Sequence, residues 1–333
     1  MADRIEIRRL VAADAEKLTT CFRRCYGDTY VAGFFHDPVA IRARLDAGAI
    51  HSVVAVTEAG EIVGHMAMTR RHADALTVEL GNTIVDPHYR GQSLAPRLGA
   101  ALFEACREGG YVGFHHYPTT AHAIMQKLAV DAGGIETGVM LGYIPADTDY
   151  KALSRESATG RLAVVAVYQP LAPAPAREVF VPARFEQLLL GIYLRAGLTR
   201  TVRPATTGHR RATDLGAAFD AARSLLRIEV ACAGADVAER VAAVANEDRA
   251  DVTHVDLLLS DPGAPEAFEA LRKKGFFFCA LLPEFSTADV LRLQRLSANA
   301  ERAAPPELVY ADARAILHAA LADREAARRG SAS

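Results

Sequence analysis

Residues 85–95, with the sequence VDPHYRGQSLA, form the segment of this chain with the clearest chemical character. A β-branched run from Leu76 to Val85 ends at a proline, an Arg-Gly turn follows, and an amphipathic helix is predicted from Ser93 to Glu108. Such a loop presents several backbone N–H groups at a helix N-terminus, where free donors and the helix dipole both favour an anion. The segment therefore predicts a phosphate-binding loop, with a plain strand–turn–helix joint as the alternative.

The same segment resembles motif A of the GNAT superfamily of acyl-CoA N-acyltransferases, in which the pattern Arg/Gln-x-x-Gly-x-Gly/Ala grips the pyrophosphate of coenzyme A. Arg90 and Ala95 match the first and last positions, whereas Ser93 stands in place of the central glycine. We expect Ser93 to keep an ordinary helical backbone and still to donate its N–H. The resemblance implies that the phosphates are held by six consecutive residues: Arg90, Gly91, Gln92, Ser93, Leu94 and Ala95.

The resemblance also implies how the rest of acetyl-CoA is bound. The pantetheine arm pairs with the backbone of Thr83, Ile84 and Val85, and an N–H of the same strand meets the thioester oxygen. Thr120 completes the expected cofactor-binding residues. We expect acetyl-CoA, or another acyl-CoA, as the co-substrate.

Glu79 is the predicted general base for the attacking amine. It lies in an apolar strand, seven residues before Asp86, where many members of the superfamily place a catalytic glutamate. Burial of an unpaired carboxylate is costly and would raise its pKa, which would make it a better base. The alternatives are that Glu79 lies on a polar face of the strand, or that it forms an ion pair with an arginine such as Arg70.

The family's usual acid for the leaving thiolate is a tyrosine four residues before the glycine that closes the next helix. Counting back from Gly133 reaches Ala129, so this tyrosine is absent. His116 and Tyr117, at the end of a short strand, are the catalytic candidates that remain, either to bind the substrate or to move a proton. Surface or packing roles are the alternative for both.

The order of elements extends the resemblance over about the first 170 residues. After the phosphate loop, a strand, a helix and a further strand resemble motif B of the same superfamily. We predict an α/β (α+β) GNAT fold with a mixed central sheet flanked by helices. The predicted elements are strands 5–10, 51–57, 61–69, 76–85, 112–116, 138–144 and 162–168, and helices 14–26, 38–47, 93–108 and 121–132.

A proline-spaced linker separates a second part of the chain from the first. We place the catalytic domain at residues 1–171, the linker at 172–177 and a smaller, degenerate GNAT-like domain at 178–333. A weak internal repeat supports this division, since both parts read as strand, proline turn, helix, glycine and apolar strand. The alternative is an unrelated α+β domain. The predicted elements here are helices 184–196, 235–246, 265–274 and 311–328 and strands 225–231, 252–259, 276–282 and 289–296.

Several side chains of the second part have more than one interpretation. Phe276, Phe277 and Phe278 are predicted to pack in a core, with a pocket lining as the alternative. Glu284 and Asp289 could reach a cleft between the domains, which is a common location for ligands.

Composition narrows the class of protein. The chain has 333 residues, a hydrophobic content of 50% and a formal net charge of −2, which argues against a dedicated nucleic-acid binder. No apolar run is long enough to cross a membrane, and the first residues are charged, unlike a signal peptide. The five cysteines are odd in number, and Cys21 and Cys25 lie four apart on a predicted helix. We therefore expect a cytoplasmic protein.

Three histidines are candidates for a metal site. His115, His116 and His122 are close in sequence, but acidic or cysteine partners are lacking beside them. We therefore expect no metal.

Two functions fit these residues. The first is an enzyme that transfers an acetyl group from acetyl-CoA to the amine of a small molecule by direct attack in a ternary complex. A protein acceptor is ranked below a small one, because the second domain would fill space beside the acceptor site. The second function is a non-catalytic acyl-CoA-binding or scaffold protein. Neither uses nucleic acid or a membrane, and a homodimer is compatible with the family.

Overall fold

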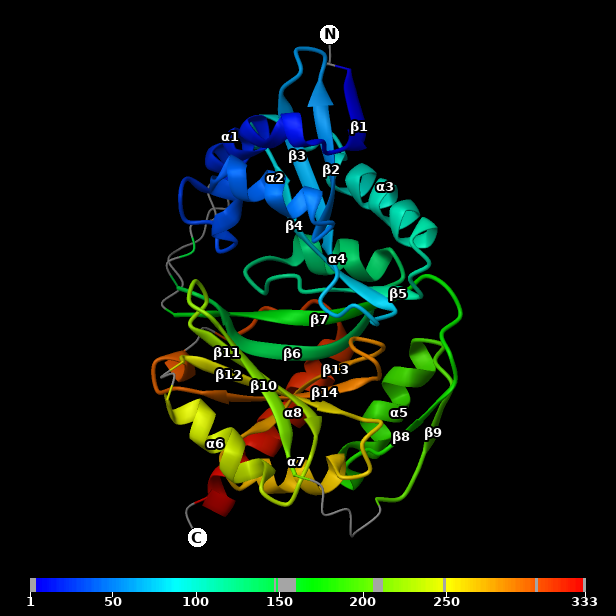
Figure 1. Ribbon diagram of the computed structural model, residues 1–333, viewed down its shortest axis with the longest axis vertical. Coiled ribbons are helices and arrows are strands. Elements are labelled where there is room, and N and C mark those ends of the chain that lie inside the picture. The colour runs from blue at the N-terminus through cyan, green and yellow to red at the C-terminus, as the bar shows by residue number, and fades with distance from the viewer. Residues whose placement is uncertain are drawn as a thin grey trace. The chain divides into compact units, whose positions relative to one another are not determined.

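The computed structural model describes residues 4–146, 148, 160–205, 212–247, 250–302 and 305–331. The chain divides into two compact units (Figure 1). Unit 1 contains residues 1–116 and 147–157, and unit 2 contains residues 117–146 and 158–333. This division differs from the predicted boundary at residue 171, and unit 2 is the larger unit rather than the smaller one.

Unit 1 is built on a mixed sheet with the strand order β1-β2-β3-β4-β5. The first four strands pair antiparallel, and β5 pairs parallel to β4. The elements are β1 (Ile5–Arg9), α1 (Ala15–Tyr26), α2 (Pro38–Asp46), β2 (Ile50–Thr57), β3 (Ile62–Thr69), β4 (Thr77–Val85), α3 (Leu94–Glu108) and β5 (Gly113–His116).

Helices cover both faces of the sheet of unit 1. Val54 and Val56 of β2 belong to the apolar core that α1 and α2 complete. On the other face, Leu98 of α3 lies against Gly64, where an added Cβ would be 3.1 Å from the leucine side chain and 3.2 Å from the Cβ of Ala55. Since side chains alternate along a strand, α3 and the α1–α2 pair cover opposite faces.

Strand β4 carries a β-bulge and separates early from β5. Asn82 and Thr83 both lie opposite Met66 of β3, and Asn82 has a positive φ of 55°. The pairing between β4 and β5 joins residues 77–79 to residues 113–115, although β4 continues to Val85. Thus the last six residues of β4 extend beyond this pairing and lead directly into the loop before α3.

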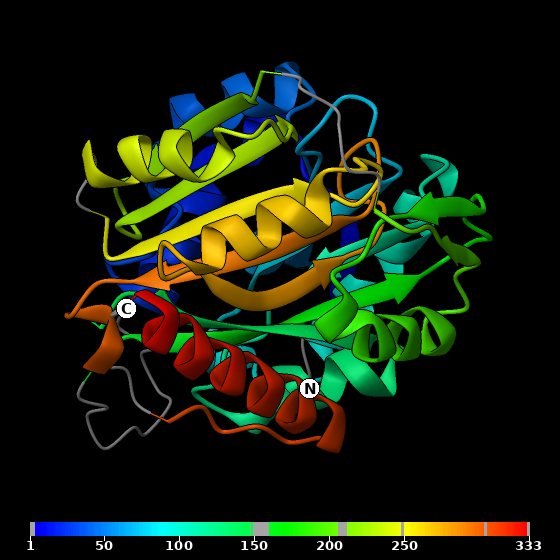
Figure 2. The same cartoon turned by 90° about the horizontal axis from the view of Figure 1, so that it is seen from below.

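Unit 2 has a mixed sheet with the strand order β7-β6-β13-β14-β12-β11-β10. Its helices α5, α6, α7 and α8 lie side by side across one face of this sheet (Figure 2). A further pair of short parallel strands, β8 and β9, stands apart. The elements are α4 (Ala123–Asp131), β6 (Ile135–Ile144), β7 (Leu162–Pro170), β8 (Arg177–Val179), α5 (Glu186–Arg195), β9 (Arg200–Val202), β10 (Asp214–Asp220), β11 (Leu225–Cys232), α6 (Val237–Glu247), β12 (Val252–Leu258), α7 (Ala264–Arg272), β13 (Phe277–Leu282), β14 (Val290–Leu296) and α8 (Ala311–Ser331).

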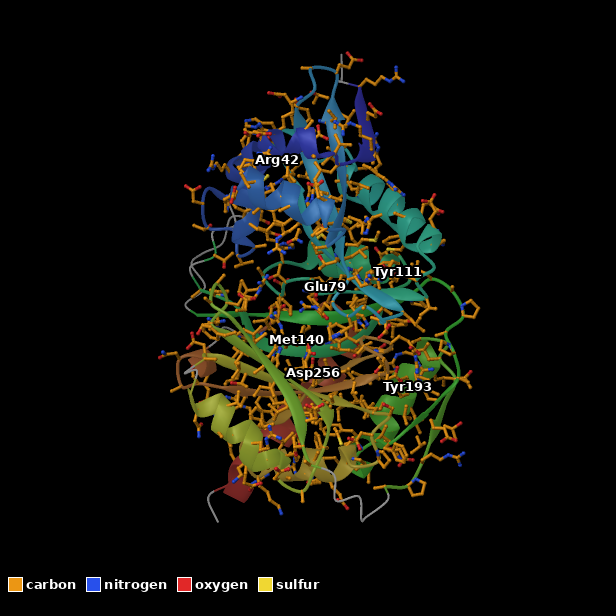
Figure 3. All side chains as sticks on the ribbon, in the orientation of Figure 1. Arg42, Glu79, Tyr111, Met140, Tyr193 and Asp256 are labelled. Atoms are coloured by element: carbon orange, nitrogen blue, oxygen red, sulfur yellow. The ribbon has the colours of Figure 1, made fainter. Side chains whose placement is uncertain are left out.

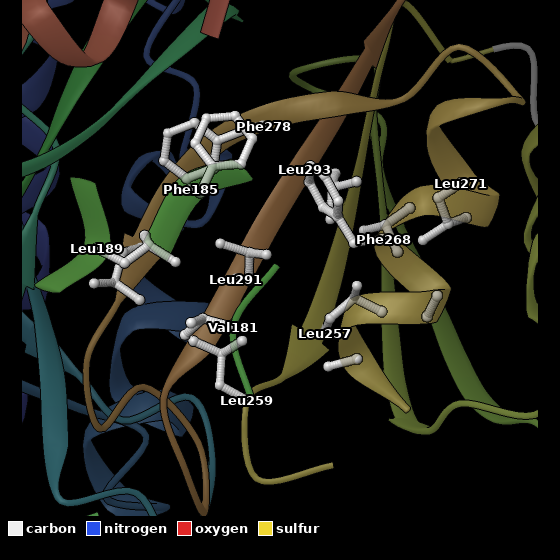
Figure 4. Close-up of a cluster of buried hydrophobic side chains, with 14 of the residues drawn as sticks. Val181, Phe185, Leu189, Leu257, Leu259, Phe268, Leu271, Phe278, Leu291 and Leu293 are labelled. Carbon is white, nitrogen blue, oxygen red and sulfur yellow. The ribbon is translucent and has the colours of Figure 1, made fainter. Parts of the chain in front are cut away.

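The main core of unit 2 lies between its sheet and its helices. The rings of Phe185 and Phe278 are tilted against each other, with centroids 4.5 Å apart, and Phe268 meets Phe185 edge to face. Figure 4 shows these three side chains among the aliphatic residues of this core. Phe276, Phe277 and Phe278 are each at most 1% exposed, so the predicted core role of this aromatic run is confirmed.

Connectivity repeats between the two units. In unit 1, β3 pairs antiparallel with β4, and α3 crosses to the parallel strand β5. In unit 2, β10 pairs antiparallel with β11, and α6 crosses to the parallel strand β12. A helix and an antiparallel strand pair follow in each part of the sequence, namely α4-β6-β7 and α7-β13-β14.

The predicted strands and helices are confirmed, with ends shifted by a few residues. The mixed α/β fold class is confirmed as well. The short strands β8 and β9 and the edge strand β10 were not predicted. None of the helices in the described part of the chain has the length and apolar character needed to span a bilayer.

Candidate functional site

The turn that follows β4 is held by a buried carboxylate. Asp86 is 2% exposed, and its Oδ1 accepts a 3.1 Å hydrogen bond from the N–H of His88. Its Oδ2 forms an ion pair with Arg24 of α1, which also donates to the carbonyl oxygen of Ile62 at 2.6 Å. Burial alone would raise the pKa of Asp86, but the hydrogen bonds from His88 and Arg24 outweigh burial and lower it. The turn is therefore tied to both α1 and β3.

The loop between this turn and α3 needs two residues with positive φ. Gly91 has a φ of 80° and Ser93 a φ of 54°. Our expectation that Ser93 keeps a helical backbone was wrong, because it adopts the left-handed conformation immediately before the first residue of α3. This conformation costs a non-glycine residue about 1–2 kcal/mol, which explains why the family pattern has glycine at this position.

Five consecutive backbone N–H groups in this loop are available for a ligand. Within the described ranges, no acceptor is found for the N–H groups of residues 91–95. Residues 90–93 are exposed, whereas Leu94 is buried and anchors α3. Arg90 donates from Nε to the carbonyl oxygen of Val85 at 3.3 Å, so its exposed guanidinium lies beside the same donors. The loop thus combines free N–H groups, a helix N-terminus and a cation, a combination suited to a phosphate.

The strand residues expected to bind pantetheine lie between the bulge and the loop. Ile84 is 3% exposed and packs in the core with α1 and α2. Thr83 and Val85 are half-buried. All three follow the point at which the pairing with β5 ends, so they are in the part of β4 that another extended chain could join.

Glu79 is paired with an arginine. Its Oε2 lies 2.6 Å from Nε and 2.5 Å from Nη2 of Arg71, and 22% of its side chain is exposed (Figure 3 labels Glu79). In the sheet, Glu79 is in register with Thr69 of β3 and His115 of β5. An ion pair with an arginine such as Arg70 was one of the alternatives for Glu79. The structure shows such an ion pair, with Arg71 as the partner, so Glu79 is not an isolated buried carboxylate.

The other predicted site residues fall in different places. His116 ends β5, and burial together with the neighbouring His115 lowers its pKa to about 4, so its ring is neutral at pH 7. Tyr117 belongs to unit 2, where its ring lies 6.1 Å from that of Tyr143. Thr120 also belongs to unit 2, and both its N–H and its hydroxyl donate at 3.0 Å to the carbonyl oxygen of Ala163. The hydroxyl of Thr120 therefore has a structural partner.

The position of the missing tyrosine is closed. Ala129 is 3% exposed and packs in a core with β6 and β7. No group of three histidine, cysteine, aspartate or glutamate side chains in the described part of the chain is arranged to hold a metal ion.

Sequence reasoning missed His65 and Asn82. His65 is fully buried in β3, and its Nδ1 lies 2.8 Å from the carbonyl oxygen of Asn82. Asn82 also accepts a 2.9 Å hydrogen bond from the hydroxyl of Tyr30 at Oδ1. The Gly81-Asn82 pair inside a β-branched strand was the available signal, since both residues tolerate unusual backbone angles.

The corresponding loop of unit 2, between β11 and α6, is closed by its own side chains. The N–H of Ala233 donates to Asp261 at 2.8 Å, and the N–H of Gly234 donates to the hydroxyl of Thr213 at 3.0 Å. Asp236 accepts from the same hydroxyl at 2.6 Å. One carboxylate and one hydroxyl thus occupy two backbone donors of this loop, and Asp236 holds that hydroxyl in place.

Glu284 and Asp289 are fully buried in unit 2. Arg200 bridges them, with contacts of 2.7 Å to Glu284 and 2.6 Å to Asp289, and Arg177 pairs with Glu284 from the other side. The network is a structural one, because each carboxylate has a charged partner.

Comparisons with known proteins identify the part of the chain that carries the loop. Residues 15–129 match the family model described as acetyltransferase (GNAT) family. No curated protein is detectably similar in sequence to this chain.

Solved structures with detectable similarity include three acetyltransferases, each with low identity. The ribosomal-protein-S18-alanine N-acetyltransferase from Escherichia coli is 16% identical, with a TM-score of 0.41, over 52% of this chain and 97% of that one. A GNAT superfamily phosphinothricin acetyltransferase from Sinorhizobium meliloti, in complex with AcCoA, is 21% identical, with a TM-score of 0.38, over 50% and 89%. A GCN5-related N-acetyltransferase from Kribbella flavida is 17% identical, with a TM-score of 0.38, over 50% and 98%. The segment matched by the family model contains α1, the bulged strand β4 and the loop before α3, so the chain carries a GNAT-family acetyltransferase region at residues 15–129.

Proposed function

We propose that this protein transfers an acetyl group from acetyl-CoA to the amine of a small molecule, by direct attack while both substrates are bound. The observation that carries the proposal is the run of five N–H groups at residues 91–95, in the loop after β4, for which the described residues offer no acceptor. Around it, Arg90 supplies a positive charge and the buried Asp86 holds the turn. The match of residues 15–129 to the acetyltransferase (GNAT) family model supports acetyl-CoA as the acyl donor, for which these groups are suited.

The donor is proposed to lie along β4. Its pyrophosphate would accept hydrogen bonds from residues 91–95, and its pantetheine arm would pair with Thr83, Ile84 and Val85. This stretch of β4 lies beyond the pairing with β5, so its backbone can receive a further extended chain. The thioester would then reach the bulge at Asn82, where a backbone N–H can stabilise the oxyanion.

Glu79 is proposed as the base. The amine nitrogen attacks the thioester carbon, the C–S bond breaks, and the amine proton passes to a carboxylate or to water. Transfer to Glu79 would be favoured when its contact with Arg71 loosens, because that guanidinium lies within 2.6 Å of Oε2 and stabilises the charged carboxylate. His116 is neutral at pH 7 and suits substrate binding better than the role of a cationic acid.

Unit 2 is proposed to contain a degenerate GNAT-like domain without an acyl-CoA site. Its β10-β11-α6-β12 connectivity repeats that of β3-β4-α3-β5, which supports a common origin. Its loop donors are already bound by Asp261 and Thr213, so a pyrophosphate would have to displace them. We therefore infer one acyl-CoA site per chain.

The second candidate is a non-catalytic acyl-CoA-binding or scaffold protein. Two observations favour it, the alanine at position 129 and the ion pair that occupies Glu79. Both concern the chemical step, and neither weakens the case for binding acetyl-CoA.

Calorimetric titration with acetyl-CoA and free CoA, followed by a thiol-release assay with a panel of small amines, tests the proposal. Micromolar binding with amine-dependent release of CoA supports the enzyme. Binding without release for every amine favours the scaffold. No binding to either ligand would contradict both functions.

A further inference from the structure

His65 is a buried side chain that uses both of its ring nitrogens. The ring meets the stacked rings of Phe22 and Phe35 edge to face, with centroids 5.4 and 5.1 Å away, and no part of it is exposed. Its Nδ1 lies 2.8 Å from the carbonyl oxygen of Asn82, and its Nε2 lies 3.0 Å from Oγ of Ser52. Packing alone does not require a histidine at this buried position, because an apolar side chain would fill the space without the free-energy cost of burying polar atoms.

The partners define which nitrogen carries the hydrogen. A carbonyl oxygen can only accept, so Nδ1 donates to Asn82 and Nε2 accepts from the hydroxyl of Ser52. Burial lowers the pKa of His65 to about 4, which keeps this ring neutral at pH 7. His65 is therefore a fixed donor aimed at one backbone carbonyl of β4.

That carbonyl belongs to the residue that makes the bulge. Asn82 has a φ of 55°, in the left-handed region, and it shares the position opposite Met66 with Thr83. Asparagine tolerates this conformation better than most residues, and contacts of its carbonyl oxygen and side chain fix the bulge in one position. Two side chains make these contacts, since His65 binds the carbonyl oxygen and Tyr30 donates to Oδ1 at 2.9 Å.

The bulge lies between the part of β4 that pairs with β5 and the part that is proposed to bind acetyl-CoA. Before it, β4 pairs with β5 as far as Glu79, and after it come Thr83, Ile84 and Val85. A β-bulge turns the strand and redirects the backbone donors that follow. A shift at Asn82 would thus misdirect the N–H groups proposed to meet the thioester and the pantetheine arm.

We propose that His65 is a positioning residue for acetyl transfer, which holds the β4 bulge through its Nδ1–H bond to Asn82 and so aims the backbone donors of β4 at the thioester. This inference rests on the proposed function. The two ring nitrogens have different roles: the bond from Nδ1 to Asn82 is needed for acetyl transfer, and the contact of Nε2 with Ser52 contributes only to stability.

Two variants of His65 separate the nitrogens. In His65→Asn, the amide N–H can replace Nδ1–H and reach Asn82. In His65→Gln, the longer amide reaches the Nε2 position and Ser52, and the donor to Asn82 is lost. Both remove the ring, so both should lower stability by similar amounts.

We expect His65→Gln to lower kcat by about 10²-fold, as for loss of one aligned donor, and His65→Asn to lower it by less than about 10-fold. The Kd for free CoA should change little in either, because the phosphate loop is untouched.

Amide hydrogen exchange over residues 80–85 tests the positioning without any activity measurement. We expect faster exchange in His65→Gln than in His65→Asn or the wild type. Tyr30→Phe removes only the hydroxyl that holds Oδ1 of Asn82, and it provides a milder variant if both histidine variants fold poorly. It should raise exchange in the same peptide and lower kcat by a smaller factor.

The outcomes distinguish this inference from the proposed function. Equal exchange over residues 80–85 in the His65→Gln and His65→Asn proteins overturns the positioning role, as does an equal kcat at matched folded fraction. If the wild type binds acetyl-CoA but no amine releases CoA, the proposed transfer fails. The exchange data then still decide whether His65 holds the bulge.

Discussion

The guanidinium of Arg71 holds the carboxylate of Glu79 by two contacts to one oxygen, at 2.6 Å from Nε and 2.5 Å from Nη2. Glu79 lies on β4, in register with His115 of β5, at the last residue of β4 that pairs with that strand. The residue that family resemblance offers as the base is thus also one partner of an ion pair. Two substitutions separate these roles.

Glu79→Gln and Arg71→Ala both remove the ion pair, but only the first removes the carboxylate. If Glu79 is the base, Glu79→Gln should lower kcat by about 10²–10⁴-fold, and Arg71→Ala should leave it within a few-fold or raise it. Steady-state thiol release with a saturating amine measures both. Similar losses in the two variants would mean that the ion pair, and not proton transfer, is what the site needs.

Ser93→Gly should improve the phosphate loop. Glycine relieves about 1–2 kcal/mol of left-handed strain at Ser93 and costs about 0.5–1 kcal/mol of extra chain entropy in the unfolded state. A net gain of about 0.5–1 kcal/mol in unfolding free energy is expected. Binding of acetyl-CoA should be retained or become tighter. Gly91→Ala is the matched reverse change, since it places a Cβ at a φ of 80° and should weaken both stability and binding. Denaturant melts and calorimetry measure these effects, and a Ser93→Gly protein less stable than the wild type would contradict the strain.

A carboxylate introduced into the loop of unit 1 should weaken binding of acetyl-CoA, whereas a carboxylate introduced into the corresponding loop of unit 2 should not. Gln92→Glu places a carboxylate beside the free N–H groups and should weaken binding of acetyl-CoA at least tenfold, because it repels the pyrophosphate. Ala235→Glu is the matched change in the exposed loop of unit 2, where Thr213 and Asp261 already bind the donors, and it should have no effect. Calorimetry of the wild type should give one site per chain. Two sites, or a loss of binding in Ala235→Glu, would show that the second loop is active.

The sequence was sufficient for the fold of unit 1 because its elements have strong local signals. Asp37 caps α2, with a 2.8 Å bond from the N–H of Val39, and Pro38 begins the helix. The edge strand β10 was missed because most of its residues are exposed, so it lacks the alternation that marks a half-buried strand.

The details of the site were harder to predict, because they depend on contacts between distant residues. Arg71 reaches Glu79 across a hairpin, and His65 reaches Asn82 from the neighbouring strand. The backbone of Ser93 is set by the closure of the loop and not by the preference of serine. Residue types located the phosphate loop, whereas the partners of Glu79 and the bulge required the structure.

The pH dependence of stability should report the neutral state of His65. In the folded protein its pKa is lowered to about 4, whereas in the unfolded chain it is about 6.5. Between these values the unfolded state binds a proton that the folded state does not. Stability contributed by the neutral ring is therefore fully present above pH 6.5 and is lost as the pH falls toward 4.

The expected slope is about 1.4 kcal/mol per pH unit for one such histidine. His116, with its pKa also lowered to about 4, adds a second contribution of the same sign. Urea melts at intervals from pH 7 to pH 5 should show His65→Asn less stable at pH 7 but with a shallower decline than the wild type. His116→Asn serves as the matched variant, since it should flatten the decline without changing amide exchange over residues 80–85. Parallel stability curves for His65→Asn and the wild type would mean that the ring of His65 is not held neutral, and its role as a fixed donor to Asn82 would then lose its basis.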